Sequence, residues 1–135
     1  MSETSSGPTY EAVTRNIRVR VAPSYLGHSL PAFPGQHLHS YQITIINEGS
    51  EVVQLLRRHW RITDGHGQVE EVRGAGVIGE QPTILPGRAH TYSSFCPLPT
   101  EVGSMQGTYQ MVTVEGKFFD VAIPAFPLVV PGARN

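Results

Sequence analysis

The sequence predicts an all-β fold, an antiparallel β-sandwich of about seven to eight strands. Apolar and polar residues alternate in several short segments, which is the pattern of half-buried strands. Turn signals recur about every 8–12 residues between these segments. The 135 residues also include 14 Gly and 11 Pro. So many helix-breaking residues argue against long helices.

The N-terminal half begins with a predicted strand at residues 16–21, NIRVRV, where valine and isoleucine alternate with arginine. Residues 23–37 contain three prolines and two glycines and are predicted to form a loop. A second strand is expected at residues 38–47. The following Asn-Glu-Gly-Ser, residues 47–50, predicts a tight turn of the kind found in hairpins.

The middle of the chain predicts a strand at residues 52–64, with a bulge near residues 55–56 and Trp60 facing the core. No helix-capping signal precedes this segment, which argues against a helix. Asp-Gly-His-Gly at residues 64–67 indicates a hairpin turn. It leads into a short strand at residues 68–73.

Residues 74–87 are too rich in glycine and proline for a helix, and one short strand is expected there around Val77 and Ile78. Pro86 and Gly87 suit the central positions of a type II turn. A further strand is predicted at residues 90–95. The segment that follows it, residues 96–107, is expected to be a long irregular connection.

The C-terminal part predicts strands at residues 108–114 and 118–123, separated by a turn at Glu115 and Gly116. Two prolines follow the last strand, and they remove hydrogen-bond donors from a sheet. We therefore expect that strand to finish at a sheet edge or as an extended tail. The single cysteine excludes the disulfide of an immunoglobulin domain, so the fibronectin type III-like version of the sandwich is favoured.

The chain is expected to be one domain at residues 10–130, with a flexible N-terminus at 1–9 and a tail at 131–135. Its net charge is −1, which argues against nucleic acid as a partner. No apolar run is long enough for a membrane helix, so no membrane insertion is expected. With one cysteine and no leader-like start, the sequence predicts a cytoplasmic protein.

A G-x-G-x-x-G pattern lies at Gly74, Gly76 and Gly79. Such glycines can cradle a pyrophosphate with backbone N–H groups, and Glu80, Gln81 and Pro82 complete the candidate binding loop. Two prolines lie among the next eight residues, so no helix can begin there to complete a dinucleotide site. The alternative is a loop that needs close backbone approach.

Alternation places Arg57, His59 and Arg61 on one strand face. This strip could contact an anionic ligand or could be an ordinary solvated face. Arg57, Arg61 or Arg73 could also assist residues 74–79 in binding a polyphosphate.

His37 and His39 are spaced to share a strand face, and they are the candidate ligands for zinc or cobalt. The alternative is a pair of surface histidines. Cys96 lies in apolar company, which favours a packing role over a nucleophile. No catalytic set is recognised, so neither enzyme activity nor a cofactor is expected.

Four motifs occur in order: W-x-I-x-D at residues 60–64, G-x-G-V-x-G-x-Q-P at 74–82, C-P-L at 96–98 and M-x-G-x-Y-x-M at 105–111. With these motifs the chain closely resembles the ApaG family over residues 12–128. The resemblance implies a fibronectin type III-like sandwich. In one departure, the segment at residues 23–39 is often acidic in the family but carries no acidic residue here.

The resemblance implies a domain without established catalytic activity, associated in some members with cobalt/magnesium efflux. Similar domains in larger proteins act as protein-interaction modules. We therefore expect a non-enzymatic interaction module that uses residues 74–82 and 96–107, including Cys96 and Pro97, to contact a protein partner. The alternatives are binding of pyrophosphate or dinucleoside polyphosphates through residues 74–79, and binding of a divalent cation. A homodimer through the exposed edge of residues 16–21 is a further expectation.

Overall fold

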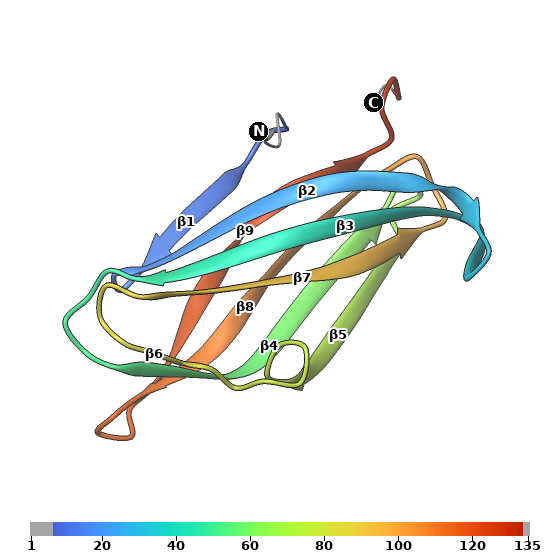
Figure 1. Ribbon diagram of the computed structural model, residues 1–135. Coiled ribbons are helices and arrows are strands. Elements are labelled where there is room, and N and C mark those ends of the chain that lie inside the picture. Colours follow the sequence, from blue (N-terminus) through green and yellow to red (C-terminus); the bar gives the residue numbers. More distant parts are fainter. Residues whose placement is uncertain (1–6, 134–135) are drawn as a thin grey trace.

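The computed structural model describes residues 7–133, which form two antiparallel sheets packed face to face (Figure 1). The first sheet has the order β1-β2-β3-β7, and the second has the order β5-β4-β8-β9 with β6 paired to β4. The strands are β1 (Tyr10–Thr14), β2 (Ile17–Leu30), β3 (Phe33–Asn47), β4 (Val53–Asp64), β5 (Val69–Ala75), β6 (Thr83–Ile84), β7 (Ala89–Leu98), β8 (Val102–Thr113) and β9 (Phe118–Val129). The predicted sandwich is confirmed. The count rises to nine because β1 and the two-residue β6 were not predicted.

The core lies between the sheets and is built from the alternating apolar residues of each strand. Trp60 on β4 is 3% exposed, as predicted for a core aromatic. Its ring stacks on Tyr41 of the opposite sheet at 5.3 Å between centroids and meets Phe126 edge-on at 6.0 Å. These aromatic contacts fix how the two sheets face each other.

Residues 23–37 were wrongly predicted to be a loop, because β2 and β3 continue through them as a long hairpin. β1 pairs with β2 only as far as Tyr10↔Val21. Pro23 therefore lies where one side of β2 has no neighbouring strand, and its missing N–H disrupts no ladder. Gly27, with φ +150°, lies at a register shift in the pairing of β2 with β3, as at a β-bulge.

The predicted irregular connection at residues 96–107 is also wrong. β7 continues to Leu98 and β8 begins at Val102, after a short turn held by Thr100. The Thr100 hydroxyl accepts a hydrogen bond from Gly65 N at 2.8 Å and donates one to Val102 O at 2.7 Å. A Cβ atom at Gly107 would collide with the backbone oxygen of His59. This glycine therefore permits close strand pairing rather than marking a loop.

The predicted hairpin turn at residues 47–50 instead carries the chain from one sheet to the other. The Asn47 side-chain oxygen accepts a hydrogen bond from Gly49 N at 3.0 Å. Its amide nitrogen donates to Ile84 O at 2.9 Å and to Glu51 O at 2.7 Å. Asn47 therefore joins the two sheets at this end.

The short strand expected around Val77 and Ile78 is wrong, because these residues lie in a tight turn and the strand is β6 at Thr83–Ile84. Other local predictions are confirmed. β4 has a register shift between Leu55 and Arg57, as the predicted bulge requires. Pro86 and Gly87 form the predicted turn: Gly87 has φ +79°, and Arg88 N donates to Leu85 O at 2.9 Å.

β9 lies at an edge of the second sheet, as its prolines predicted. Residues 16–21 do not form an edge, because β2 is paired on both sides, with β1 and β3. That segment is therefore not available for the edge-to-edge dimer that the sequence suggested.

The strands span Tyr10–Val129, inside the predicted domain range of 10–130. The predicted flexible terminus at 1–9 and tail at 131–135 fall partly on residues 1–6 and 134–135, which lie outside the described residues. From residue 7 to residue 133, the structure contains no helix long and apolar enough to cross a membrane.

Candidate functional site

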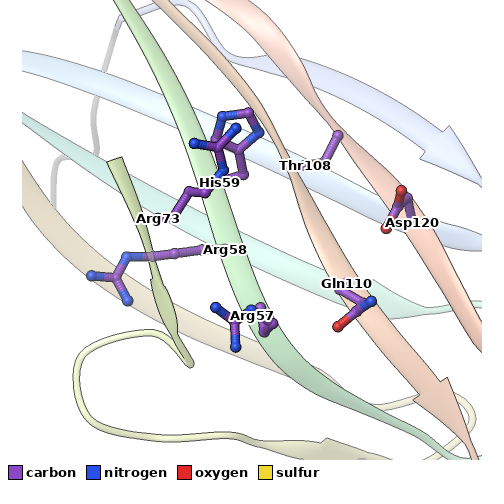
Figure 2. A pocket seen from close by; sticks show the side chains of 7 residues that line it. All are labelled: Arg57, Arg58, His59, Arg73, Thr108, Gln110 and Asp120. Carbon is purple, nitrogen blue, oxygen red and sulfur yellow. The ribbon is translucent and has the colours of Figure 1, made fainter. Parts of the chain in front are cut away.

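The outer face of the second sheet carries a cluster of basic side chains in a shallow pocket of about 170 Å³. Figure 2 shows Arg57 and His59 on β4, Arg73 on β5, and the polar side chains of β8 and β9 on the other side. Its lining residues are Arg57, Arg58, His59, Arg73, Thr108, Gln110 and Asp120. Three arginines and one aspartate give this pocket an excess of positive charge.

The register of the strands explains how the pocket forms. After the bulge in β4, Arg57, His59 and Arg61 face outward while Trp60 faces the core, as alternation predicted. His59 pairs with Arg73 on one side and Thr108 on the other. A basic row on two neighbouring strands therefore lies beside a neutral polar strand.

The basic side chains of the pocket differ in the hydrogen bonds and ion pairs that they form. The Arg57 side chain is exposed and has no hydrogen bond or ion pair with any residue in the described range. Arg73 lies 3.2 Å from Glu71 Oε1, and His59 Nε2 lies 2.7 Å from the same oxygen. The hydrogen bond from His59 and the charge of Arg73 lower the pKa of Glu71. Among the arginines that line this pocket, Arg57 is thus the one best placed to receive an external anion.

Arg58 has a structural role. Its Nη1 donates to Ala75 O at 3.1 Å and to Gly76 O at 2.9 Å, and its guanidinium lies against Gly74. A Cβ atom on Gly74 would lie 2.9 Å from this guanidinium. Gly74 therefore leaves room for Arg58, which holds the start of residues 74–82, called the glycine loop below.

The glycine loop contains a two-residue turn at Ile78 and Gly79. Val77 and Glu80 exchange both backbone hydrogen bonds, at 2.8 and 3.0 Å, and Gly76 N donates to Leu56 O at 2.8 Å. Ile78 has φ +46° and Gly79 has φ +75°, as a type I′ turn requires. Three of the N–H groups that could hold pyrophosphate are therefore already bonded within the protein.

The residues after the turn attach the loop to β4. Gln81 donates from its side chain to Leu56 O at 2.9 Å and accepts at its backbone oxygen from Gln54 Nε2 at 3.0 Å. Pro82 O accepts from Leu55 N at 3.0 Å. The side chain of Glu80 is exposed. Most of this candidate loop is thus engaged in holding its own shape at the bulge of β4.

Cys96 and Pro97 lie on β7 in the other sheet and are not brought together with the arginine pocket. Cys96 is 3% exposed, and burial raises the pKa of its thiol to about 12. This agrees with the predicted packing role. Pro97 is exposed beside a separate depression of about 410 Å³ that Asp64 and Glu70 also line.

His37 and His39 share a face of β3, but their surroundings differ. His37 Nδ1 is hydrogen-bonded to the Tyr25 hydroxyl at 3.0 Å, and its ring lies 4.3 Å from that of His28. His39 is 2% exposed. Within residues 7–133, no three His, Cys, Asp or Glu side chains form a metal-binding group. The divalent-cation site stays a prediction, which a rise in melting temperature with excess cobalt would support.

Sequence reasoning did not find Thr108, Gln110 and Asp120 as neighbours of the arginines. Gln110 pairs with Arg57 on β4 and with Asp120 on β9. Which strands pair, and in which register, is not encoded in the alternation of any one strand. Only a knowledge of the β4–β8 and β8–β9 pairings could have revealed these residues.

Comparison with known proteins identifies relatives over most of the chain. The family model described as the ApaG domain matches residues 31–113. Protein ApaG of Mesorhizobium japonicum is 53% identical over 126 residues, covering 93% of this chain and 97% of that protein. Protein ApaG of Caulobacter vibrioides is 52% identical over 129 residues, covering 96% and 92%.

A solved structure agrees with these relatives. The crystal structure of an ApaA protein from Bordetella pertussis superposes with a TM-score of 0.80 at 44% identity, covering 87% of this chain and 95% of that one. Sequence and fold therefore agree over most of the length. The chain belongs to the ApaG family.

Proposed function

We propose that this ApaG-family domain is a non-enzymatic protein-interaction module that binds an acidic segment of a partner protein on the outer face of the second sheet. The observation that carries the proposal is Arg57, an exposed guanidinium with no ion-pair partner among the described residues, in a pocket with Arg73 and His59. A guanidinium in this state can form a bidentate pair with a carboxylate.

The shape of the surface favours an extended segment over a single small ion. A second depression, of about 330 Å³, adjoins the first and shares His59 and Thr108 with it. It continues the surface past Arg61 toward Ala125 on β9. Two adjoining depressions, each with an arginine, suit a peptide that carries acidic residues at intervals.

Two further parts of the proposal concern catalytic activity and cellular location. Cys96 is the only cysteine, and its raised pKa leaves it protonated near neutral pH, which supports a role without cysteine-based covalent catalysis. We place the interaction in the cytoplasm, as the composition predicted. The cobalt/magnesium efflux association of the family would then be indirect, carried by the protein that this domain binds.

The experiment is capture of partners from a cell extract by the full chain and by matched variants. Wild type and Arg88→Ala should retain the same acidic partner, because Arg88 is an exposed arginine outside both depressions. Arg57→Ala and Arg73→Ala should lose it, and added salt should weaken it. A partner retained equally by all four proteins would contradict the proposed surface.

Small phosphorylated compounds are the second candidate ligands, and the same pocket rather than the glycine loop supports them. Arginines bind phosphate oxygens as well as carboxylates, and the pocket of about 170 Å³ can hold a phosphate group. Calorimetric titration with pyrophosphate and a dinucleoside polyphosphate tests this candidate. Heat that disappears in Arg57→Ala supports it, and no heat at millimolar ligand excludes it.

A further inference from the structure

The first sheet ends in a strand whose outer side has no neighbouring strand. β7 pairs with β3 along its whole length, and no strand of the described residues pairs with its other side (Figure 1). Asn47 N donates to Arg88 O at 3.0 Å, so the backbone groups of the even-numbered residues of β7 point toward β3. Those of the odd-numbered residues, from Ala89 to Pro97, point away from the sheet. The position of Pro97 agrees with this, since its missing N–H disrupts no bond to β3.

The other edge strands are each protected from pairing with another chain. β1 and β9 lie against each other on one side of the sandwich, where Ala122 N donates to Thr14 Oγ1 at 3.1 Å. β5 carries the charged residues Glu71 and Arg73. β7 contains no Asp, Glu, Lys or Arg, and its outward-pointing residues include Phe95, which is 60% exposed. Because covered or charged edges resist the addition of a strand, β7 is the edge that remains open to it.

The two ends of β7 carry opposite charges that are unpaired. Arg88 immediately precedes the strand, and its exposed side chain forms no ion pair within the described range. At the other end, the depression of about 410 Å³ is lined by Leu98 together with Asp64 and Glu70, and by no Lys, Arg or His. We call it the acidic depression. Glu70 also lacks an ion-pair partner among residues 7–133. One open strand therefore has a basic group at its start and an acidic depression at its end.

We propose that the protein forms a symmetric homodimer in which β7 of one copy pairs antiparallel with β7 of a second copy. The two-fold axis passes beside Ser93, which is the middle one of the outward-pointing residues. In this register Ser93 faces Ser93 of the second copy, and Thr91 faces Phe95 of the second copy. Residues that face each other in this way exchange N–H···O bonds. A β-branched residue opposite an aromatic residue adds a favourable side-chain contact.

The same register brings the unpaired charges together. Residues at equal distances from Ser93 face each other, so Arg88 lies opposite Leu98 of the second copy. Alternation gives the even-numbered residues of β7 the inner face, as the burial of Leu98 shows. The Arg88 side chain is therefore on the side of the acidic depression that Leu98 lines. The two-fold axis repeats this contact, so both copies contribute an arginine and an acidic depression. This charge complementarity favours a second copy as the occupant over an unrelated strand.

The dimer leaves the arginine surface of each copy open, because that surface lies on the outer face of the other sheet. This proposal can therefore fail while the proposed function stands, and the reverse. A single edge strand buries less area than a standard interface, so we expect a dissociation constant in the micromolar to millimolar range.

The test is sedimentation equilibrium of the full chain at protein concentrations up to about 1 mM, where a weak dimer is populated. Arg88→Glu places a carboxylate against the acidic depression, and Glu70→Arg places a guanidinium against Arg88. Each variant alone should dimerise at least about tenfold more weakly than wild type. Lys117→Glu makes the same charge change at the exposed turn between β8 and β9, and it should dimerise like wild type.

An equimolar mixture of Arg88→Glu and Glu70→Arg is the decisive measurement. In the mixed dimer the new carboxylate faces the new guanidinium, and the other contact keeps the native pair. The mixture should therefore regain most of the affinity that each variant loses alone.

Ser93→Pro tests the strand pairing itself. It removes the central outward N–H and no bond to β3, so the dimer should be lost. If this variant does not fold, the charge variants decide, because they change only exposed residues. A wild-type protein that stays monomeric at the highest concentration, or a mixture no stronger than either variant alone, would overturn the proposal.

Discussion

Arg57 on the outer face of the second sheet and His39 in the interior each carry a polar group without a partner among residues 7–133, and the two groups differ in their contact with water. The guanidinium of Arg57 is exposed and stays hydrated, so its lack of a partner costs little. His39 is 2% exposed, and an unpaired buried nitrogen costs about 1–3 kcal/mol. A ligand at Arg57 must therefore compete with water and salt, whereas the unpaired nitrogen of His39 is a penalty already present in the fold.

The largest expected effect comes from disturbing the β4–β8 pairing beneath the arginine pocket. In Gly107→Ala, the new Cβ would meet the backbone oxygen of His59, so β4 and β8 would have to separate there. We expect a loss of about 3 kcal/mol or more in the free energy of unfolding, measured by urea denaturation. Gly116→Ala is the control, because its Cβ meets nothing within 4 Å and only the positive φ of +86° is strained. Equal losses in both variants would contradict a tight β4–β8 contact.

The next largest effect is the pH dependence of folding stability that His39 contributes. Its pKa is about 4 in the folded protein against 6.5 for the unperturbed side chain. Between these values the unfolded chain binds more protons, so stability is complete above pH 6.5 and falls as the pH drops to 4. The total is about 3 kcal/mol, and His39→Leu should remove that component of the pH dependence. The check is the loss of stability between pH 7 and pH 4.5, measured by denaturation. An equal loss in wild type and His39→Leu would be evidence that the folded protein does not bury His39 as a neutral imidazole.

Arg58 and Arg57 make a matched pair for separating structure from binding. Arg58→Ala removes two hydrogen bonds to the backbone of residues 75 and 76 and should cost about 1–2 kcal/mol of stability. Arg57→Ala should change stability by less than about 0.5 kcal/mol. Thermal unfolding of the two variants measures the difference. Similar melting temperatures for both would argue against an anchoring role for Arg58.

The smallest effect on stability should accompany a gain in binding. Glu71→Gln removes the carboxylate that occupies His59 and Arg73, and Glu71 is solvent-exposed, so no measurable change in melting temperature is expected. Affinity for an acidic partner peptide should rise about threefold at low salt, because a competing negative charge is gone. The matched variant Glu80→Gln should show no gain. Weaker binding in Glu71→Gln would mean that the carboxylate positions the arginine rather than competing for it.

The features that could be predicted from the sequence are those that one strand reveals by itself. The outward position of Arg57, His59 and Arg61 follows from alternation in β4. The burial of His39 does not, because it depends on the long β2–β3 hairpin. The three prolines and two glycines of residues 23–37 led to the prediction of a loop there. Prolines and glycines act differently at an unpaired strand side than in a turn, and only the pairing tells these cases apart.

At Asn47 the chain passes from the first sheet to the second, and this connection affects the order of folding. Because β3 and β4 lie in different sheets, β4 must pair with β8, about 50 residues later in the chain, whereas β2–β3 and β8–β9 are joined by short turns. Closing a long loop before its contacts form is slow, so we expect the two hairpins to form early and the β4–β8 pairing late. Arg57 and Gln110 meet across that late pairing. The binding surface would then be completed only in the final step of folding, and a partially folded chain would not present it.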